Sequence, residues 1–79
     1  MLTPILDAGD RRPLYEQLYR HIRGEIEAGR LKAGTRLPSK RALATHLKVS
    51  VVTVEGAYDQ LLAEGYLRSE ARRGFFVQA

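Results

Sequence analysis

Residues 39–65 read SKRALATHLKVSVVTVEGAYDQLLAEG, and this segment carries the strongest structural signals in the sequence. It holds two apolar patterns of helical spacing, the first opened by Ser39 and the second opened by Ser50 and ended by Gly65. Serine is a preferred N-cap and glycine often ends a helix, so we predict one helix over residues 40–47 and a second from Ser50 to Gly65. Two helices joined by so short a turn are typical of a helix-turn-helix, although an ordinary helical hairpin in a small bundle fits the same pattern.

A longer amphipathic helix is predicted on the N-terminal side of this stretch, over residues 11–28. Its apolar positions recur at helical spacing and comprise Leu14, Leu18, Ile22 and Ile26. Asp10 is placed to cap this helix, and Pro13 suits its first turn. Residues 1–10 show no sustained periodicity, so we predict an N-terminal arm there.

Short β-prone segments flank the central stretch. Residues 35–38 predict one edge strand, and residues 66–69 and 75–77 predict a β-hairpin. The turn of this hairpin contains Arg72, Arg73 and Gly74. We therefore predict a mostly α fold with a small β-hairpin: a winged helix-turn-helix of three helices and a two- to three-stranded antiparallel wing, over residues 11–79.

The composition is that of one ordinary globular domain. The chain has 79 residues, of which 44% are hydrophobic and 28% charged, and its formal net charge is +4. It has no cysteine, which excludes disulfides and thiolate zinc sites, and we assign no metal to His21 or His46. No apolar run approaches the roughly 18 residues that span a bilayer, and no secretory signal pattern opens the chain, so we expect a cytoplasmic location and no membrane partner.

The positive charge is concentrated in one part of the sequence. Six lysines and arginines, and no acidic residue, occur between positions 30 and 48, namely Arg30, Lys32, Arg36, Lys40, Arg41 and Lys48. Such a stretch suits a phosphate-facing surface, although a solvated basic face has the same composition. The acidic side chains of the following helix are expected to face solvent, away from this basic stretch; they are Glu55, Asp59 and Glu64.

Blocks of residues along most of the chain recur at the spacing of one known protein family. They are PLYEQL at 13–18, GRLKAGTRLPSKRALA at 29–44, VS at 49–50, TV at 53–54, AY at 57–58, LLAEGYL at 61–67 and GFFV at 74–77. In these blocks the sequence resembles the GntR family of bacterial transcriptional regulators, and it is most similar to the MocR branch. Members of that branch carry a pyridoxal-phosphate-binding, aminotransferase-like domain after the DNA reader. The resemblance therefore implies no cofactor in this chain, and pyridoxal phosphate only in a further domain of a longer parent protein.

The resemblance implies a DNA contact at the start of the first helix of the motif. In the family, the basic residue at the position of Arg41 contacts DNA, and Lys40 beside it suits a phosphate. Ser39 can add its hydroxyl and its backbone N–H, because a helix N-terminus favours anions. Exposed charges that only keep the protein soluble would fit the same residues.

The second helix of the motif would be the recognition helix. The family's geometry implies that it starts at Ser50 and directs toward the major groove Val51, Val52, Thr53 and Glu55. Many family members have basic residues at the positions of Val51 and Glu55, so the usual bidentate contact with guanine is not expected here. We expect contacts with thymine methyls and cytosine amino groups instead, unless at least one valine packs into the core.

The wing completes the predicted DNA-binding surface. Arg72 and Arg73, with Gly74 beside them, suit the minor groove, where the potential is most negative over narrow A·T tracts. The resulting function is sequence-specific binding of duplex DNA in transcriptional regulation, by a homodimer on two half-sites, in association with the bacterial nucleoid. The alternative is a winged-helix protein-interaction module. No paired carboxylates, activated nucleophile or phosphate-cradling loop is present, so we do not expect an enzyme.

Overall fold

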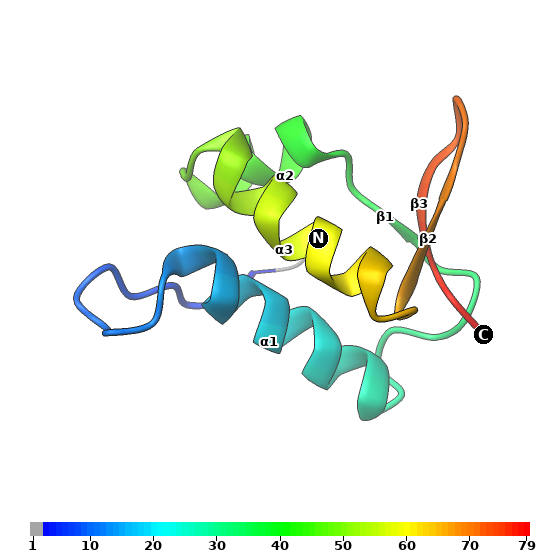
Figure 1. Ribbon diagram of the computed structural model, residues 1–79, viewed down its shortest axis with the longest axis horizontal. Helices are drawn as coiled ribbons and strands as arrows, with labels where there is room; N and C mark the ends of the chain where they lie inside the picture. The colour runs from blue at the N-terminus through cyan, green and yellow to red at the C-terminus, as the bar shows by residue number, and fades with distance from the viewer. Residues whose placement is uncertain (1–2) are drawn as a thin grey trace.

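Three helices and a three-stranded sheet make up the regular structure of residues 3–79, the part of the chain that the computed structural model describes (Figure 1). In chain order the elements are α1 (Leu14–Glu27), β1 (Arg36–Leu37), α2 (Lys40–Leu47), α3 (Val51–Ala63), β2 (Leu67–Glu70) and β3 (Gly74–Val77). This order confirms the predicted winged helix-turn-helix, and the sheet, which was predicted with two or three strands, has three. Met1 and Leu2, which belong to the predicted arm, lie outside the described residues.

The core forms around α3, which packs against α1, α2 and β2. The largest side chains with no exposed surface are Tyr58, Leu18, Ile22, Leu43, Leu61, Val54 and Val77. Each apolar side chain of this size stabilises the fold by about 1.5–3 kcal/mol through burial. The predicted apolar stripe of α1 is therefore confirmed at its centre, while Leu14 and Ile26 at its ends are only partly buried.

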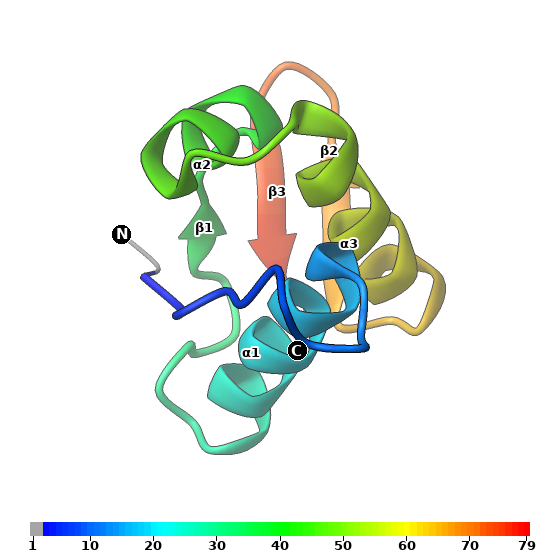
Figure 2. The same cartoon turned by 90° about the vertical axis from the view of Figure 1, so that its left-hand side faces the viewer.

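The sheet has the strand order β1-β3-β2, and both pairings are antiparallel. Its inner face packs on α3, where the rings of Phe75 and Tyr58 meet edge to face with centroids 5.0 Å apart. Because successive strand residues face opposite sides, Phe76 points outward and has Arg36 on β1 and Arg68 on β2 as its cross-strand neighbours. Figure 2 shows β1 leading upward from the sheet directly into α2.

The turn between α2 and α3 depends on one residue in the left-handed region. Lys48 has φ of 59° and ends α2, and its backbone N–H and that of Val49 still donate to carbonyls of the helix, those of Thr45 and Ala44. The chain then extends to Ser50, which opens α3. The two predicted serine caps are thus both confirmed.

The start of α1 differs from the prediction. The helix begins at Leu14, after Pro13, and no side chain caps it. A proline disfavours helical backbone at the residue before it, so Arg12 cannot belong to the helix. Asp10 is not the cap: its Oδ1 accepts a hydrogen bond of 2.8 Å from the backbone N–H of Arg12. The guanidinium of Arg12 also contacts this carboxylate, and together these bonds lower the pKa of Asp10.

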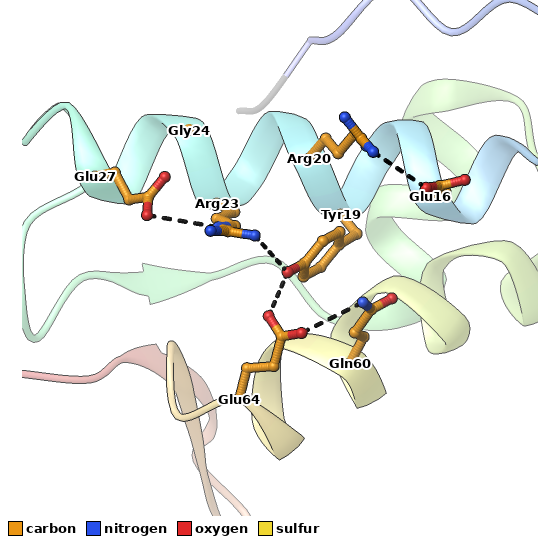
Figure 3. A pocket seen from close by; sticks show the side chains of 8 residues that line it. All are labelled: Glu16, Tyr19, Arg20, Arg23, Gly24, Glu27, Gln60 and Glu64. Atoms are coloured by element: carbon orange, nitrogen blue, oxygen red, sulfur yellow. Dashed lines mark hydrogen bonds and ion pairs between the residues drawn. The ribbon is translucent and has the colours of Figure 1, made fainter. Parts of the chain in front are cut away.

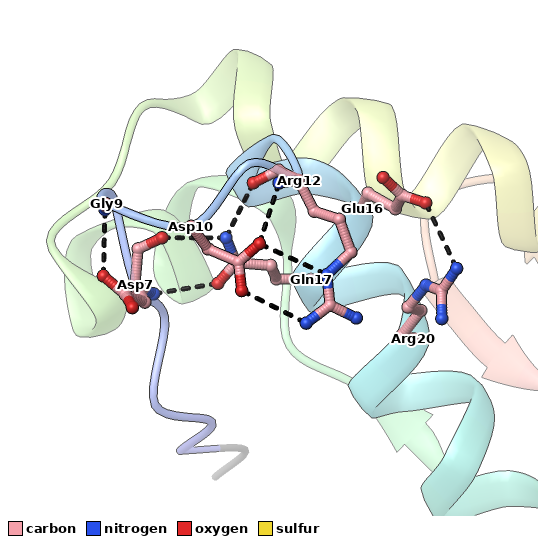
Figure 4. A network of polar contacts seen from close by, with 7 residues as sticks. All are labelled: Asp7, Gly9, Asp10, Arg12, Glu16, Gln17 and Arg20. Carbon is pink, nitrogen blue, oxygen red and sulfur yellow. Dashed lines mark hydrogen bonds and ion pairs between the residues drawn. The ribbon is translucent and has the colours of Figure 1, made fainter.

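The segment before α1 is tied to that helix by one glutamine (Figure 4). The Nε2 of Gln17 donates to the backbone carbonyls of Asp7 and Arg12 at 2.9 and 2.8 Å, and its Oε1 accepts from the backbone N–H of Asp7 at 2.8 Å. Leu6 packs against the core from this segment, whereas Ile5 is 97% exposed. Residues 3–13 therefore lie along the domain without forming a helix or strand.

Candidate nucleic-acid interface

The N-terminus of α2 presents the first group of predicted site residues. The Oγ of Ser39 accepts a hydrogen bond of 3.1 Å from the backbone N–H of Ala42, which fixes the first turn of the helix. Arg41 is exposed and makes no ion pair within residues 3–79. Its charge, added to the positive end of the helix, makes this N-terminus a surface suited to phosphate.

Lys40, unlike Arg41, forms an ion pair. Its Nζ lies 3.3 Å from Oε2 of Glu55 on α3 and 5.5 Å from the centre of the Phe75 ring. It therefore connects α2, α3 and the wing, and part of its charge is already compensated. This pairing also overturns one expectation: Glu55 does not face away from the basic stretch, because it contacts a lysine of that stretch across the short turn between the two helices.

The N-terminal turn of α3 carries the second group. The Oγ of Ser50 accepts a 3.1 Å hydrogen bond from the backbone N–H of Thr53 and lies 2.9 Å from the hydroxyl of Thr53. Val51 and Val52 are 41% and 74% exposed, whereas Val54 is fully buried. Neither of the first two valines packs into the core, so the alternative reading of these side chains is wrong and both are free to contact a ligand.

The turn between β2 and β3 carries the third group. Arg72 has φ of 65° and makes no ion pair among the described residues. Arg73 folds back along the outer face of the hairpin, where its Nη1 lies 2.8 Å from Oε1 of Glu70 and its guanidinium 5.3 Å from the centre of the Phe76 ring. Gly74 has φ of 112°, a conformation that a side chain would strain.

The three groups lie toward the same end of the molecule. In Figure 2, α2, the start of α3 and the β2–β3 turn form its upper edge, while α1 and the loop that follows α1 lie below. A buried hydroxyl fixes part of this arrangement, since Tyr58 of α3 donates a 2.7 Å hydrogen bond to the carbonyl of Pro38 between β1 and α2. Burial raises the pKa of this phenol well above its ordinary value.

A second polar cluster lies between α1 and α3 and is separate from these groups (Figure 3). The hydroxyl of Tyr19 donates to Oε1 of Glu64 and accepts a 3.1 Å hydrogen bond from Arg23. The hydrogen bond to Glu64 raises the pKa of Tyr19. Glu64 is exposed, as expected, and it also accepts this hydrogen bond from a buried tyrosine. The hollow here measures about 490 Å³, and its charged side chains already pair with one another.

The predicted basic stretch of residues 30–48 does not lie on one surface. Arg30 and Lys32 belong to the loop between α1 and β1, at the opposite end of the molecule from the β2–β3 turn (Figure 2), and Arg30 pairs with Glu25 at 2.6 Å. These two cations therefore lie outside the interface.

Sequence reasoning missed Tyr58 as a residue that shapes this interface, and it named Arg36 only as one charge of the basic stretch. Tyr58 interrupts the apolar stripe of α3 with a hydroxyl, and a buried tyrosine hydroxyl needs a partner, so a polar tie could have been anticipated but not its position. The guanidinium of Arg36 lies against Gly74, because a Cβ placed on that glycine would be 3.4 Å from Nε of Arg36. No local pattern indicates that contact.

Two kinds of feature are absent from residues 3–79: a membrane-spanning helix and a cluster of metal-binding side chains. No helix among these residues is long and apolar enough to cross a membrane. No group of three or more histidine, cysteine, aspartate or glutamate side chains in this part of the chain could hold a metal ion.

Comparison with known proteins finds bacterial transcriptional regulators. The family model described as "Bacterial regulatory proteins, gntR family" matches residues 14–77. The chain is 52% identical over 76 residues to the HTH-type transcriptional regulator YhdI of Bacillus subtilis, covering 96% of this chain and 16% of that protein. It is 51% identical over 73 residues to the probable rhizopine catabolism regulatory protein MocR of Rhizobium meliloti, covering 92% of this chain and 15% of that protein. The chain thus spans only a small part of the length of these relatives.

Solved structures of transcriptional regulators are also similar to this chain. YtrA from Sulfolobus acidocaldarius, a GntR-family transcription factor, is similar with a TM-score of 0.89 and 37% sequence identity, covering 95% of this chain and 79% of that chain. The DNA-binding domain of AraR in complex with operator ORE1 is similar with a TM-score of 0.78 and 26% identity, covering 98% of this chain and 94% of that chain. Both similarities extend over nearly the whole of the chain.

Proposed function

This chain belongs to the GntR family of bacterial regulatory proteins, and we propose that its interface binds duplex DNA with α3 in the major groove and the β2–β3 turn at the minor groove. Sequence-specific DNA binding in the regulation of transcription is the function that this family membership assigns to the chain. The observation that carries our proposal is that three parts of the chain lie at the same end of the molecule: the basic N-terminus of α2, the exposed N-terminus of α3 and the β2–β3 turn.

The N-terminus of α2 fits the DNA backbone. Ser39 and Arg41 offer a hydroxyl, a helix N-terminus and an unpaired guanidinium to one phosphate. Such contacts fix the position of a protein on the duplex without reading its sequence. Lys40 adds charge there, although its bond to Glu55 means that a phosphate must compete with a carboxylate for it.

The start of α3 fits the edges of bases. Val51 and Val52 can pack against thymine methyl groups, and the hydroxyl of Thr53 can bond a base edge or a phosphate. Glu55 can accept a hydrogen bond from a cytosine amino group, and its contact with Lys40 reduces the repulsion that a free carboxylate would meet from the phosphates. We therefore propose a site that is read mainly through apolar contacts and does not centre on guanine.

The wing fits the minor groove. Arg72 projects from the turn without an ion pair in the described structure, and narrow A·T tracts attract such a side chain. Gly74 lets the backbone of the wing approach closely. This contact would add affinity for A·T-rich sequence beside the bases that α3 reads.

Several properties belong to a longer protein of the kind that the relatives represent. We propose that the regulator acts as a homodimer on two half-sites, because one such module reads only a few base pairs. We also propose a cytoplasmic location at the nucleoid, as DNA binding requires, and a role without catalysis. We propose that this chain itself holds no cofactor and that pyridoxal phosphate, as the MocR resemblance implies, would bind another domain of such a protein.

The experiment is a titration of fluorescent A·T-rich and G·C-rich duplexes at two salt concentrations. The unsubstituted chain is compared with two double variants, Lys40→Ala with Arg41→Ala and Arg72→Ala with Arg73→Ala. Binding should weaken with salt and in both double variants. A third double variant, Arg30→Ala with Lys32→Ala, removes two cations from the loop after α1 and serves as the matched control, which should bind as tightly as the unsubstituted chain.

The alternative function, a protein-interaction module that uses the exposed valines, gives a different result in the same titration. Phosphate neutralisation predicts that the logarithm of the binding constant falls linearly with the logarithm of the salt concentration. No binding to either duplex at low salt would contradict the DNA-binding proposal and favour a protein partner for Val51 and Val52.

A further inference from the structure

We propose that Arg36 of β1 is a further DNA-binding residue, which contacts a backbone phosphate between the N-terminus of α2 and the wing. The inference rests on the proposed binding of duplex DNA and adds a strand to the interface, which so far comprises two helix ends and one turn. It comes from the position, the direction and the unpaired charge of this side chain.

The position of Arg36 follows from the strand register. Arg36 pairs with Phe76 and Leu37 pairs with Phe75, and Leu37 is buried beneath the sheet. Because neighbouring strand residues face opposite sides, Arg36 lies on the outer face. Only Leu37 and Pro38 separate it from Ser39, the cap of α2, and its strand lies next to β3, which follows the turn of the wing (Figure 2).

The direction of the side chain is toward the turn of the wing. Although Arg36 pairs with Phe76, its guanidinium extends along the sheet to Gly74, two residues closer to the turn. A Cβ added to Gly74 would lie 3.4 Å from Nε, 3.7 Å from Nη2 and 3.9 Å from Cζ of Arg36. The guanidinium of Arg36 therefore lies beside the backbone at the base of the turn.

The charge of Arg36 is available, in contrast to that of its neighbours on the outer face. Arg68 and Arg73 each lie 2.8 Å from a carboxylate oxygen of Glu70, and both guanidinia lie 5.3 Å from the centre of the Phe76 ring. Arg36 is exposed and forms no hydrogen bond or ion pair through its side chain within residues 3–79. Of these three arginines, Arg36 is the one whose charge no carboxylate of the described structure compensates.

A backbone phosphate is the partner that fits these observations. If α2 rests on one stretch of backbone and the β2–β3 turn enters the minor groove, a strand of phosphates passes between them. Arginine suits this position because its planar fork donates two hydrogen bonds to phosphate oxygens. Each phosphate so neutralised releases counterions and contributes about 0.9 to the slope of log K against log salt.

The test compares single variants that each remove one positive charge. Arg36→Gln retains a polar side chain, and Lys32→Gln is the matched control, because the loop between α1 and β1 that contains Lys32 lies at the opposite end of the molecule from the wing turn (Figure 2). Affinities for one A·T-rich duplex are measured by fluorescence anisotropy over a series of salt concentrations. Thermal unfolding of each variant is recorded in parallel.

We expect Arg36→Gln to weaken binding at low salt and to lower the magnitude of the slope by about 0.9, with Lys32→Gln unchanged. Arg36→Lys should keep the slope, because it keeps the charge, while losing part of the affinity. An unchanged slope in Arg36→Gln, or an equal loss in Lys32→Gln, would overturn the assignment of Arg36. Failure of the unsubstituted chain to bind the duplex would instead overturn the proposed function, so the two failures are distinguishable.

Discussion

Replacing Tyr58 by phenylalanine removes one buried hydrogen bond and leaves the shape of the core unchanged. The ring keeps its edge-to-face contact with Phe75, but the 2.7 Å bond to the carbonyl of Pro38 is lost. A hydrogen bond contributes about 1 kcal/mol net, and an unsatisfied buried carbonyl adds a cost, so we expect the free energy of unfolding to fall by about 1–2 kcal/mol. For a domain of this size, each 1 kcal/mol lowers Tm by about 4–8 °C.

The assay is urea and thermal unfolding followed by circular dichroism. Tyr15→Phe is the matched control, since its side chain is partly exposed and its hydroxyl has no hydrogen-bond partner within residues 3–79. The control should change stability by less than about 0.5 kcal/mol. If Tyr58→Phe were as stable as the unsubstituted chain, the buried bond between α3 and the segment before α2 would not contribute to stability as we infer.

The same variant predicts a change at alkaline pH. Burial raises the pKa of Tyr58 in the folded state, so the folded protein holds this proton more tightly than the unfolded chain. This contribution to stability is full below the unfolded pKa of about 10 and decreases as the pH rises above it. Stability should therefore fall less steeply above pH 10 in Tyr58→Phe. A slope identical to that of the unsubstituted chain would contradict the pKa direction.

Three further predictions concern the helices and the base-reading surface. Gly24→Ala should raise the free energy of unfolding by about 1 kcal/mol, because nothing lies within 4 Å of the added Cβ. Gly56→Ala should lower the free energy of unfolding, because its Cβ would lie 3.2 Å from Cβ of Tyr15. A shift of both variants in the same direction on urea unfolding would contradict this pair of predictions. Ser50→Ala should cost about 1 kcal/mol by removing the cap of α3, and an unchanged urea midpoint would argue against the cap. Val52→Ala should leave Tm within a few degrees of that of the unsubstituted chain, because this side chain is 74% exposed. The variant should show a weaker preference for thymine-containing sites selected from a random DNA pool. If that preference were retained, Val52 would not read bases.

The elements themselves could be predicted from the sequence because local signals agree with the fold. Ser39 and Ser50 each open a helix where a capping side chain is expected, and the β-prone residues on either side of Arg72 and Arg73 form the predicted hairpin. Most boundaries differ from the predicted ones by one residue. The largest difference, at the start of α1, came from giving Asp10 the role of cap when the geometry before Pro13 prevents a helix there.

The candidate site could be predicted only in part, because several of its features depend on contacts distant in sequence. The pair of Lys40 with Glu55 joins two helices across a turn, and Arg36 meets Gly74 across a sheet. Periodicity indicates which side a residue faces and not which partner it finds there. The same limit explains why Arg72 and Arg73, adjacent in sequence and treated alike, differ in the structure: only Arg73 reaches Glu70.

The most direct test of the DNA-binding face is a titration of the isotope-labelled chain with an A·T-rich duplex, followed by two-dimensional NMR. We expect the backbone amide signals of residues 39–41, 50–53 and 71–74 to shift together as duplex is added, while those of α1 remain in place. Shifts confined to α1 and the hollow beside it, with these three segments unchanged, would contradict the proposed DNA-binding face.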